Sequence, residues 1–292
     1  MPNLKEVKNR ISSVVSTQQI TKAMKMVAAA KLRKSQDRIL QMRPFAQKLD
    51  FLLSNLSSAQ SNEQTSWYNA QRESSKILIV VVSSDRGLCG SFNSNILKTV
   101  SKLLLEDYKE QHAKGNVTIL PLGKKVNEFF SKRKVKVDSR YWSVFSRLTF
   151  EETSIIASQI MEAFENKEFD KVVLVYNEFK NVATQVLRTE QYLPILPEAQ
   201  TQESSNVDYI YQPNREEIVN GLVPKSLKVK LFKALLESNA AENGARMTAM
   251  DKATENAGEL LKELRLSYNR TRQAAITKEI LEIVAGAEAL KG

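Results

Sequence analysis

The sequence contains very little of the chemistry on which most enzymes depend. Its 292 residues include one cysteine, Cys89, and one histidine, His112. A single cysteine excludes a disulfide within the chain and fits a reducing compartment. One cysteine and one histidine do not make a transition-metal ligand set. A helix is expected between them and His112 lies in a charged segment, so we do not expect a Cys–His catalytic pair.

Long apolar runs are also missing. The chain is 42% hydrophobic and 26% charged, and no stretch approaches the roughly 20 apolar residues that span a bilayer. The first ten residues, MPNLKEVKNR, lack the apolar core of a secretory signal, and we expect no transit peptide. This composition predicts a soluble protein.

Residues that break helices are scarce near the N-terminus. Glycine is absent before Gly87, and no proline occurs between Pro2 and Pro44. We predict a helix from about Asn3 to about Ser57, with a bend near Pro44. Three successive rows of apolar residues are expected to form its buried face: Leu4, Val7, Ile11 and Val14; then Ile20, Ala23, Val27 and Ala30 after a phase slip; then Ile39, Met42, Ala46, Leu49, Leu53 and Leu56.

The last third of the chain has no proline after Pro224. One row of apolar residues in this part has helical spacing, with successive members four, three, four and three residues apart. It consists of Ile276, Ile280, Ile283, Ala287 and Leu290. This spacing predicts a long helix that packs on another helix, with an interruption at Gly221 to Pro224 before it. Such a helix would be roughly 100 Å long. A compact chain of this size has a radius of gyration of about 19 Å, so the helix must project and be covered.

The middle of the chain alternates short apolar runs with amphipathic segments. We predict strands in Lys76–Ser84, Asn116–Gly123, Lys134–Val137, Lys171–Phe179 and 183–196, and a short strand-like stretch at 209–211. The nearly continuous apolar character of the first is typical of a buried parallel strand. Alternation of strands and helices predicts a Rossmann-like α/β domain with a mostly parallel sheet.

We therefore expect an α/β fold in which long terminal helices enter and leave a central domain and pair as an antiparallel coiled coil. The predicted segments are an N-terminal coiled-coil helix (1–58), a linker rich in Ser, Gln and Asn (59–75), a central α/β domain (76–212) and a C-terminal coiled-coil helix (213–292).

Positive charge is concentrated at one end. The net charge is +10, and the first 48 residues hold eleven Lys and Arg but only two acids, Glu6 and Asp37. A basic helix can bind a nucleic-acid backbone. Alternatively, the two ends of the chain form a shaft whose basic residues face acidic or polar protein surfaces. The coiled-coil spacing and the lack of interleaved aromatic residues favour the shaft.

One loop deserves comparison with phosphate-binding motifs. Gly87 to Gly90 lies between a predicted strand and a predicted helix, but it matches neither G-x-G-x-x-G nor the P-loop. We interpret it as a tight turn, and Asp85 beside Arg86 as a turn residue or a loop ion pair. No catalytic set, metal site or cofactor site can be assembled, so the chain is not expected to be an enzyme by itself.

Four segments resemble one family. They are residues 18–36 (QQITKAMKMVAAAKLRKSQ), 83–93 (SSDRGLCGSFN), 245–257 (ARMTAMDKATENA) and 268–290 (YNRTRQAAITKEILEIVAGAEAL). In this order and over essentially the whole chain, they are similar to the γ subunit of rotary F-type ATP synthases. The last segment carries the family's C-terminal pattern, which consists of Ile276, Thr277, Glu279, Glu282, Gly286 and Ala287.

The resemblance implies a central-stalk rotor. Its coiled coil would turn inside a ring of three α and three β subunits, and its α/β domain would lie against the ε subunit and the c ring. Proton flow would drive rotation, and ATP would be made on the β subunits, so γ needs no cofactor and binds no nucleic acid. A bacterial origin is favoured, with the subunit peripheral on the cytoplasmic side of the plasma (inner) membrane.

The resemblance also implies which residues contact the stator. Arg272, Gln273, Thr277, Glu279 and Glu282 match the part of the C-terminal helix that meets the lower catch region of β and the facing N-terminal helix. Two alternatives to a stator contact remain. Hydrophobic residues at this level could simply pack within the coiled coil, and Arg272 and Gln273 could lie on a solvated helix face.

Three further positions come from the other two helical segments. Met24 and Lys25 match the first helix at the same level, and Arg246 matches the second motif. The chain departs from the chloroplast branch, because no regulatory insert lies between Gln191 and Pro224 and Cys89 is the single cysteine of the sequence. Thiol control is therefore not expected.

Overall fold

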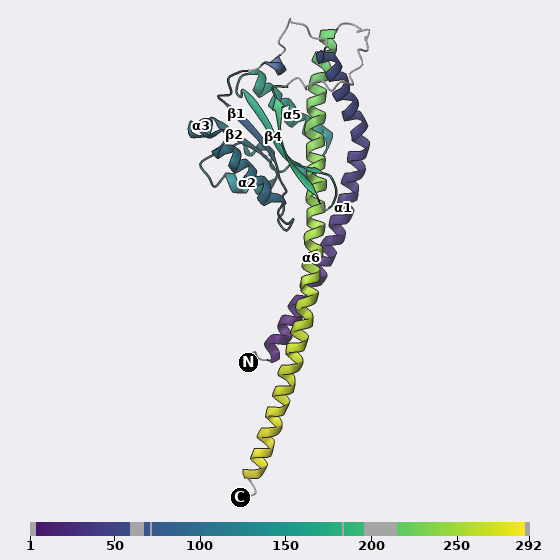
Figure 1. Ribbon diagram of the computed structural model, residues 1–292, viewed down its shortest axis with the longest axis vertical. Coiled ribbons are helices and arrows are strands. Elements are labelled where there is room, and N and C mark those ends of the chain that lie inside the picture. The colour runs from purple at the N-terminus through teal and green to yellow at the C-terminus, as the bar shows by residue number, and fades with distance from the viewer. Residues whose placement is uncertain (1–3, 59–66, 71, 183, 196–214, 290–292) are drawn as a thin grey trace. The chain divides into compact units, whose positions relative to one another are not determined.

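A computed structural model describes residues 4–58, 67–70, 72–182, 184–195 and 215–289. The chain divides into two compact units, one made of Met1–Ala29 with Arg246–Gly292 and the other of Ala30–Ala245. Two long helices, α1 (Leu4–Ser58) and α6 (Arg215–Ala289), contribute to both units (Figure 1). We describe the units separately, as the sheet unit (30–245) and the helix-pair unit (1–29 with 246–292).

The sheet unit is built on five strands in the order β3-β2-β1-β4-β5. Their bounds are β1 (Ile77–Val82), β2 (Val117–Leu122), β3 (Lys136–Val137), β4 (Lys171–Phe179) and β5 (Gln185–Leu193). Val80 lies opposite both Leu120 and Leu174 in the parallel part of the sheet. Only β5 is antiparallel, and it pairs with β4. The predicted mostly parallel α/β fold is confirmed.

The central strands are apolar because both faces of the sheet are covered. Every residue of β1 and β2 is buried, as is typical of parallel strands. One face packs on α5 (Phe150–Glu165) and on α6, through a cluster that includes Leu174 and Leu235. The other face contacts α2 (Phe92–Leu105), and Figure 1 shows α2 and α5 on opposite sides.

Shorter elements complete this unit. They are η1 (Trp67–Asn69), α3 (Lys109–Ala113), α4 (Lys124–Phe130), η2 (Ser139–Tyr141) and η3 (Val144–Arg147). Thr149 caps α5, because its side-chain oxygen accepts a hydrogen bond from the Glu152 backbone N–H.

The parts of α1 and α6 within the sheet unit pack as predicted, with one exception. Ile39, Ala46 and Leu49 of the third predicted row are buried. The predicted interruption at Gly221 to Pro224 is wrong, because α6 is continuous from Arg215. Proline removes a single backbone donor, and the burial of the flanking Val223 and Leu227 in the core holds the helix in place.

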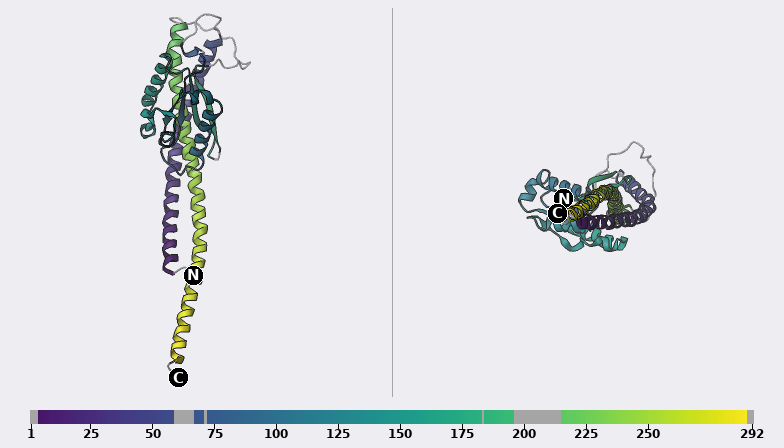
Figure 2. Two further views of the ribbon diagram at one scale, coloured as in Figure 1. Left: turned by 90° about the vertical axis from the view of Figure 1, so that its left-hand side faces the viewer. Right: turned by 90° about the horizontal axis from the view of Figure 1, so that it is seen from below.

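In the helix-pair unit, α1 and α6 run antiparallel and side by side (Figure 2). Contacts link Thr21 to Thr254 and Lys25 to Asp251, so higher numbers on α1 meet lower numbers on α6. The first predicted row, from Leu4 to Val14, faces inward with Val7 buried.

The second predicted row of α1 is wrong. Ile20, Ala23, Val27 and Ala30 are exposed. Thr21 and Ala28 are buried instead, so the buried face continues along the helix without a phase slip. The reason is that polar side chains at the inward positions find partners on α6, which removes the penalty for burying them.

Some predictions fall on other residues. The linker at 59–66, the strand-like stretch at 209–211, the domain boundary at 212 and Leu290 lie outside the described residues, as do the side chains of Leu53 and Leu56.

Candidate interaction surface

Polar contacts hold the centre of the helix pair. Thr21 Oγ1 and Thr254 Oγ1 share a hydrogen bond of 2.8 Å, and Gln18 Nε2 donates to the Thr254 carbonyl oxygen at 3.4 Å. Lys25 Nζ forms an ion pair with Asp251, and these two side chains are 39% and 44% exposed. These polar contacts between α1 and α6 therefore mainly fix the register of the two helices, and they bury little apolar surface.

Small residues let the two helices approach closely. Ala28 on α1 and Ala257 on α6 are buried. A methyl group added at Gly258 would lie 3.1 Å from Gln18 Nε2, so a larger residue there would press on the facing helix. Met250, Leu261 and Leu264 supply the larger apolar side chains of α6 that are buried in this unit.

The pairing ends well before α6 does. Extending the register of Thr21 with Thr254 places Leu4, the first described residue of α1, level with Thr271. Every described residue of α6 from Ile276 to Ala289 is exposed. This unpaired segment (276–289) is a helix without a partner helix in the described chain (Figure 1).

The unpaired segment contains the row that was predicted to pack on another helix. Ile276, Ile280 and Ile283 are 47%, 54% and 70% exposed, and Leu281 and Val284 are exposed beside them. The prediction of a covering helix is therefore not met within the described chain, because α1 is too short to reach this far. Contiguous exposed apolar side chains of this kind mark an interaction site.

Five of the six predicted site residues on α6 lie in or next to this exposed segment, and Arg246 does not. Arg272, Gln273, Thr277, Glu279 and Glu282 are all exposed. Thr277 Oγ1 donates to the Gln273 carbonyl oxygen at 2.9 Å within the helix. Glu282 lies 3.5 Å from Lys278 in a pair exposed to solvent, which contributes little to stability.

The other three predicted residues occupy a different environment. Met24, Lys25 and Arg246 are half-buried. The structure does not gather the predicted residues into one cluster. Lys25 pairs with Asp251, a residue that the sequence prediction did not name. The opposite charges of these two residues, each within one of the helical motifs, could have indicated the pair.

Apolar side chains are also exposed on the outer face of α1. Ile20, Met26 and Val27 are exposed and lie within two turns of one another. We call these three residues the outer apolar patch. They belong to the first of the motifs that carry the family resemblance.

In the sheet unit, the loop after β1 is a structural turn. Leu88 and Gly90 have φ values of 65° and 58°. Asn93 Nδ2 donates to Ser84 Oγ at 2.7 Å and to Cys89 Sγ at 3.2 Å. Cys89 is buried. This network fills the turn with side chains, in agreement with the interpretation of 87–90 as a tight turn.

The carboxyl ends of β1 and β2 leave no room for a phosphate group between them. Gly123 approaches Ser83 so closely that an added methyl group would lie 2.2 Å from the Ser83 carbonyl oxygen. This part of the sheet is occupied by the protein itself.

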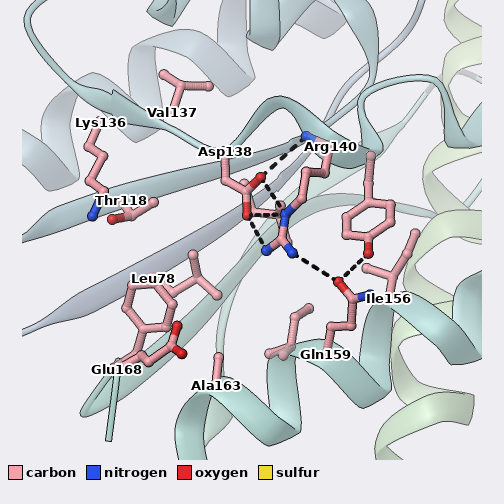
Figure 3. Close-up of a pocket in the computed structure, with 14 residues that line it drawn as sticks. Leu78, Thr118, Lys136, Val137, Asp138, Arg140, Ile156, Gln159, Ala163 and Glu168 are labelled. Atoms are coloured by element: carbon pink, nitrogen blue, oxygen red, sulfur yellow. Dashed lines mark hydrogen bonds and ion pairs between the residues drawn. The ribbon is translucent and has the colours of Figure 1, made fainter. Parts of the chain in front are cut away.

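A pocket of about 330 Å³ lies instead at the amino ends of the strands, between the sheet and α5 (Figure 3). Arg140 donates to both carboxylate oxygens of Asp138 and to Gln159. The hydrogen bond from Arg140 holds the pKa of the Asp138 carboxyl below its usual value, and the same contact raises the pKa of Arg140. Because the positive charge of Arg140 is already balanced by the Asp138 carboxylate, this guanidinium is a weak candidate for binding an anion.

Neither a membrane-spanning helix nor a metal-binding cluster is found in the described part of the chain. None of its helices combines the length and the apolar character that crossing a membrane requires. Within the same residues, no group of three His, Cys, Asp or Glu side chains is arranged to hold a metal ion.

Comparison with known proteins identifies the family. The family model described as ATP synthase matches residues 3–290. The chain is similar to the ATP synthase gamma chain of Cytophaga hutchinsonii, with 54% identity over 99% of both chains. It is 52% identical to the ATP synthase gamma chain of Chlorobaculum parvum over the whole of both.

Solved structures agree with this assignment. The central stalk and c-ring structure of the Tetrahymena thermophila mitochondrial ATP synthase contains a chain with 28% identity and a TM-score of 0.55, covering 80% of this chain and 99% of that one. A chain of the Euglena gracilis mitochondrial ATP synthase shares the fold with a TM-score of 0.67 at 20% identity, over 98% of this chain and 94% of that one. The chain belongs to the ATP synthase gamma chain family.

Proposed function

We propose that this chain is the central-stalk rotor subunit of an F-type ATP synthase and transmits rotation between the c ring and the catalytic β subunits. One observation carries the proposal. The unpaired segment of α6 (276–289) exposes a row of isoleucines that no described part of the chain covers. In a member of this family, the surrounding α and β subunits are the surface that would cover it.

A rotor works by differential contact and needs no active site of its own. A partner shifts a conformational equilibrium only when it contacts the two states differently. The exposed end of α6 has isoleucines on one face and, by helical spacing, charged residues such as Lys278 and Glu282 on another. The shaft therefore presents chemically different surfaces in different directions. Each β subunit would meet a different one at a given angle, while ATP is bound and made on β.

The partners follow from this role. Three α and three β subunits would surround the helix pair, and the ε subunit and the c ring would bind the remaining part of γ. The chain would be a non-catalytic, peripheral subunit on the cytoplasmic side of a bacterial inner membrane, coupling proton transport to ATP synthesis. Family membership and the likeness to central-stalk structures support these assignments.

The stator-facing residues are proposed on exposure and position. Arg272, Gln273, Thr277, Glu279 and Glu282 are exposed on α6 at or beyond the end of its pairing with α1. Arg272 offers a planar guanidinium that can bind a carboxylate through two hydrogen bonds. Met24, Lys25 and Arg246 are half-buried and would combine helix packing with contact to the stator.

Nucleic-acid binding is the weaker account of the same surfaces. Phosphate backbones attract lysine and arginine, but they offer nothing to cover the isoleucines of the unpaired segment or the outer apolar patch. The exposed apolar surface on both helices therefore favours a protein partner.

Reconstitution tests the proposed function. The purified chain would be mixed with α and β subunits from the same organism, and assembly would be followed by size-exclusion chromatography and ATPase assay. We expect a complex of three α, three β and one γ that hydrolyses ATP faster than α and β alone. No complex, together with salt-sensitive binding of RNA or DNA in a parallel titration, would overturn the proposal.

A further inference from the structure

A glutamate lies inside the sheet unit without the contacts that a charged carboxylate requires. Glu237, on α6, is 2% exposed. Its Oε2 atom is buried and has no hydrogen-bond partner among the described residues. Burying an ionised carboxylate in this way is costly, and a protein avoids the cost by keeping the group neutral.

Other acids face Glu237 from the sheet. Glu178 on β4 and Glu190 on β5 both act on it electrostatically. Glu190 Oε1 accepts a hydrogen bond of 3.1 Å from the Tyr176 hydroxyl. The charge of Glu237 also acts electrostatically on this hydroxyl. Two neighbouring carboxylates therefore oppose a negative charge on Glu237.

The nearby cations are mostly engaged with those acids. Arg188 Nε donates to Glu178 Oε2 at 2.7 Å, and Lys230 Nζ lies 3.7 Å from Glu190. Lys233 on α6 and Arg43 on α1 favour the charged form of Glu237. Neither forms an ion pair with Glu237 within 4.0 Å in the described structure, so their effect is weaker than a direct salt bridge.

We propose that Glu237 is a buried proton-binding site whose ionisation weakens the packing of α6 on β4 and β5. The ligand is a proton, and the site lies between α6 and the antiparallel edge of the sheet. This inference is independent of the proposed rotor function, because it rests only on contacts within residues 30–245.

The direction of the pH effect follows from linkage. Burial, more than any single neighbour, raises the pKa of the Glu237 carboxyl above its usual value, and Glu178 and Glu190 add to the rise. In the unfolded chain the carboxyl has its ordinary pKa of about 4.3. Between these two values the folded state holds a proton that the unfolded state has released. Folding stability from this residue is therefore fully present at low pH and is lost as the pH rises through the folded-state pKa.

The substitution Glu237→Gln tests the site, because glutamine keeps the shape and cannot ionise. Thermal unfolding of the full chain would be followed by tryptophan fluorescence at pH values from 4.5 to 8.5. Both tryptophans, Trp67 and Trp142, fall within residues 30–245, so the signal reports the sheet unit. We expect E237Q to match the parent at pH 4.5 and to melt about 2–4 °C higher at the alkaline end.

Glu162→Gln is the matched control, because Glu162 is exposed and lies in the same unit as Glu237 and both tryptophans. It should leave the pH profile of the parent unchanged. A profile of E237Q parallel to that of the parent over the whole pH range would overturn the proposal, since the proton would then contribute nothing to folding.

A second measurement on the unsubstituted chain covers the case in which E237Q does not fold. NMR of glutamate labelled with ¹³C at the side-chain carboxyl would follow each titration directly, with the Glu237 resonance assigned from Glu237→Asp. We expect this resonance to titrate above the ordinary range for glutamate, which is centred near 4.3. Titration of Glu237 within that range would contradict the proposal.

Discussion

The sheet unit buries side chains on both faces of a five-stranded sheet, whereas the helix-pair unit buries only one narrow row along two helices. Every residue of β1 is buried. Between Met250 and Leu264, by contrast, only Met250, Ala257, Leu261 and Leu264 of α6 are fully buried. The first unit can be stabilised by its own apolar core, and the second has little core of its own.

This difference explains where the exposed apolar side chains are. In the helix pair, inward positions are occupied by Thr21, Lys25 and Thr254, and the outer apolar patch is exposed. The threonine pair and the partly exposed ion pair contribute about 1 kcal/mol or less each. A shaft with this seam depends on its surroundings for stability, as expected of a part that turns inside a ring of partners.

The largest expected effect lies in the core of the sheet unit. Phe164 on α5 is fully buried, and replacing it with alanine leaves a cavity that should cost about 3–5 kcal/mol of unfolding free energy. Urea denaturation followed by tryptophan fluorescence measures this. Phe150→Ala, on the same helix but with its ring partly exposed, is the control and should cost clearly less. Equal losses would show that the sheet unit has no dominant core.

The next effect separates function from stability at the exposed end of α6. Replacing Arg272 and Gln273 together with alanine should leave urea unfolding of the free chain unchanged, because both side chains are exposed. Loss of charge-assisted hydrogen bonds of about 1.5–3 kcal/mol should lower assembly or coupled ATP synthesis about tenfold or more. Alanines at Lys262 and Glu263, exposed where α6 is paired, are the control. Normal assembly and normal synthesis in the Arg272 and Gln273 variant would remove both residues from the interface.

A smaller effect is expected from the threonine contact in the helix pair. Thr21→Val keeps the shape of the side chain but removes the hydrogen bond to Thr254, which should cost about 1 kcal/mol. Hydrogen exchange of the amides near Thr254 in the free chain measures the local loss. Thr17→Val serves for comparison, because Thr17 is exposed and bonds only within its own helix. Indistinguishable exchange in the two variants would mean that the seam does not depend on this contact.

The smallest effect belongs to the ion pair between Lys25 and Asp251. Both side chains are more than a third exposed, so a double-mutant cycle with Lys25→Met and Asp251→Asn should give a coupling of about 0.2–1 kcal/mol. Raising the salt concentration should reduce it further. A coupling that is large and independent of salt would show that the pair is shielded from solvent.

Sequence patterns predicted the sheet unit better than the helix pair. A run such as that of β1 can be buried only in a covered sheet, so its pattern determines its environment. In α1, however, Ile20 and Val27 have helical spacing and are exposed, while Thr21 is buried. Helical spacing identifies a face but not what covers it, and the polar partner on α6 lies more than 200 residues away.

Individual contacts were beyond the reach of the sequence. The pairing of Arg140 with Asp138 and Gln159 depends on how α5 lies beside a short 3₁₀ turn. In the sequence, Glu237 is one of many acidic residues on a predicted helix. Only its burial in the folded chain distinguishes it from them. The candidate interface residues came from family resemblance, because no rule of periodicity distinguishes a stator contact from a solvated face.

Hydrogen–deuterium exchange of the free chain and of the chain assembled with α and β tests the central claim most directly. The amides of 276–289 should exchange rapidly in the free chain, because this segment has no partner helix, and slowly in the assembled complex. Those of the central strand β1 should exchange slowly in both. Protection of 276–289 that is already complete in the free chain, or absent from the complex, would contradict the account of α6 as a shaft covered by its partners.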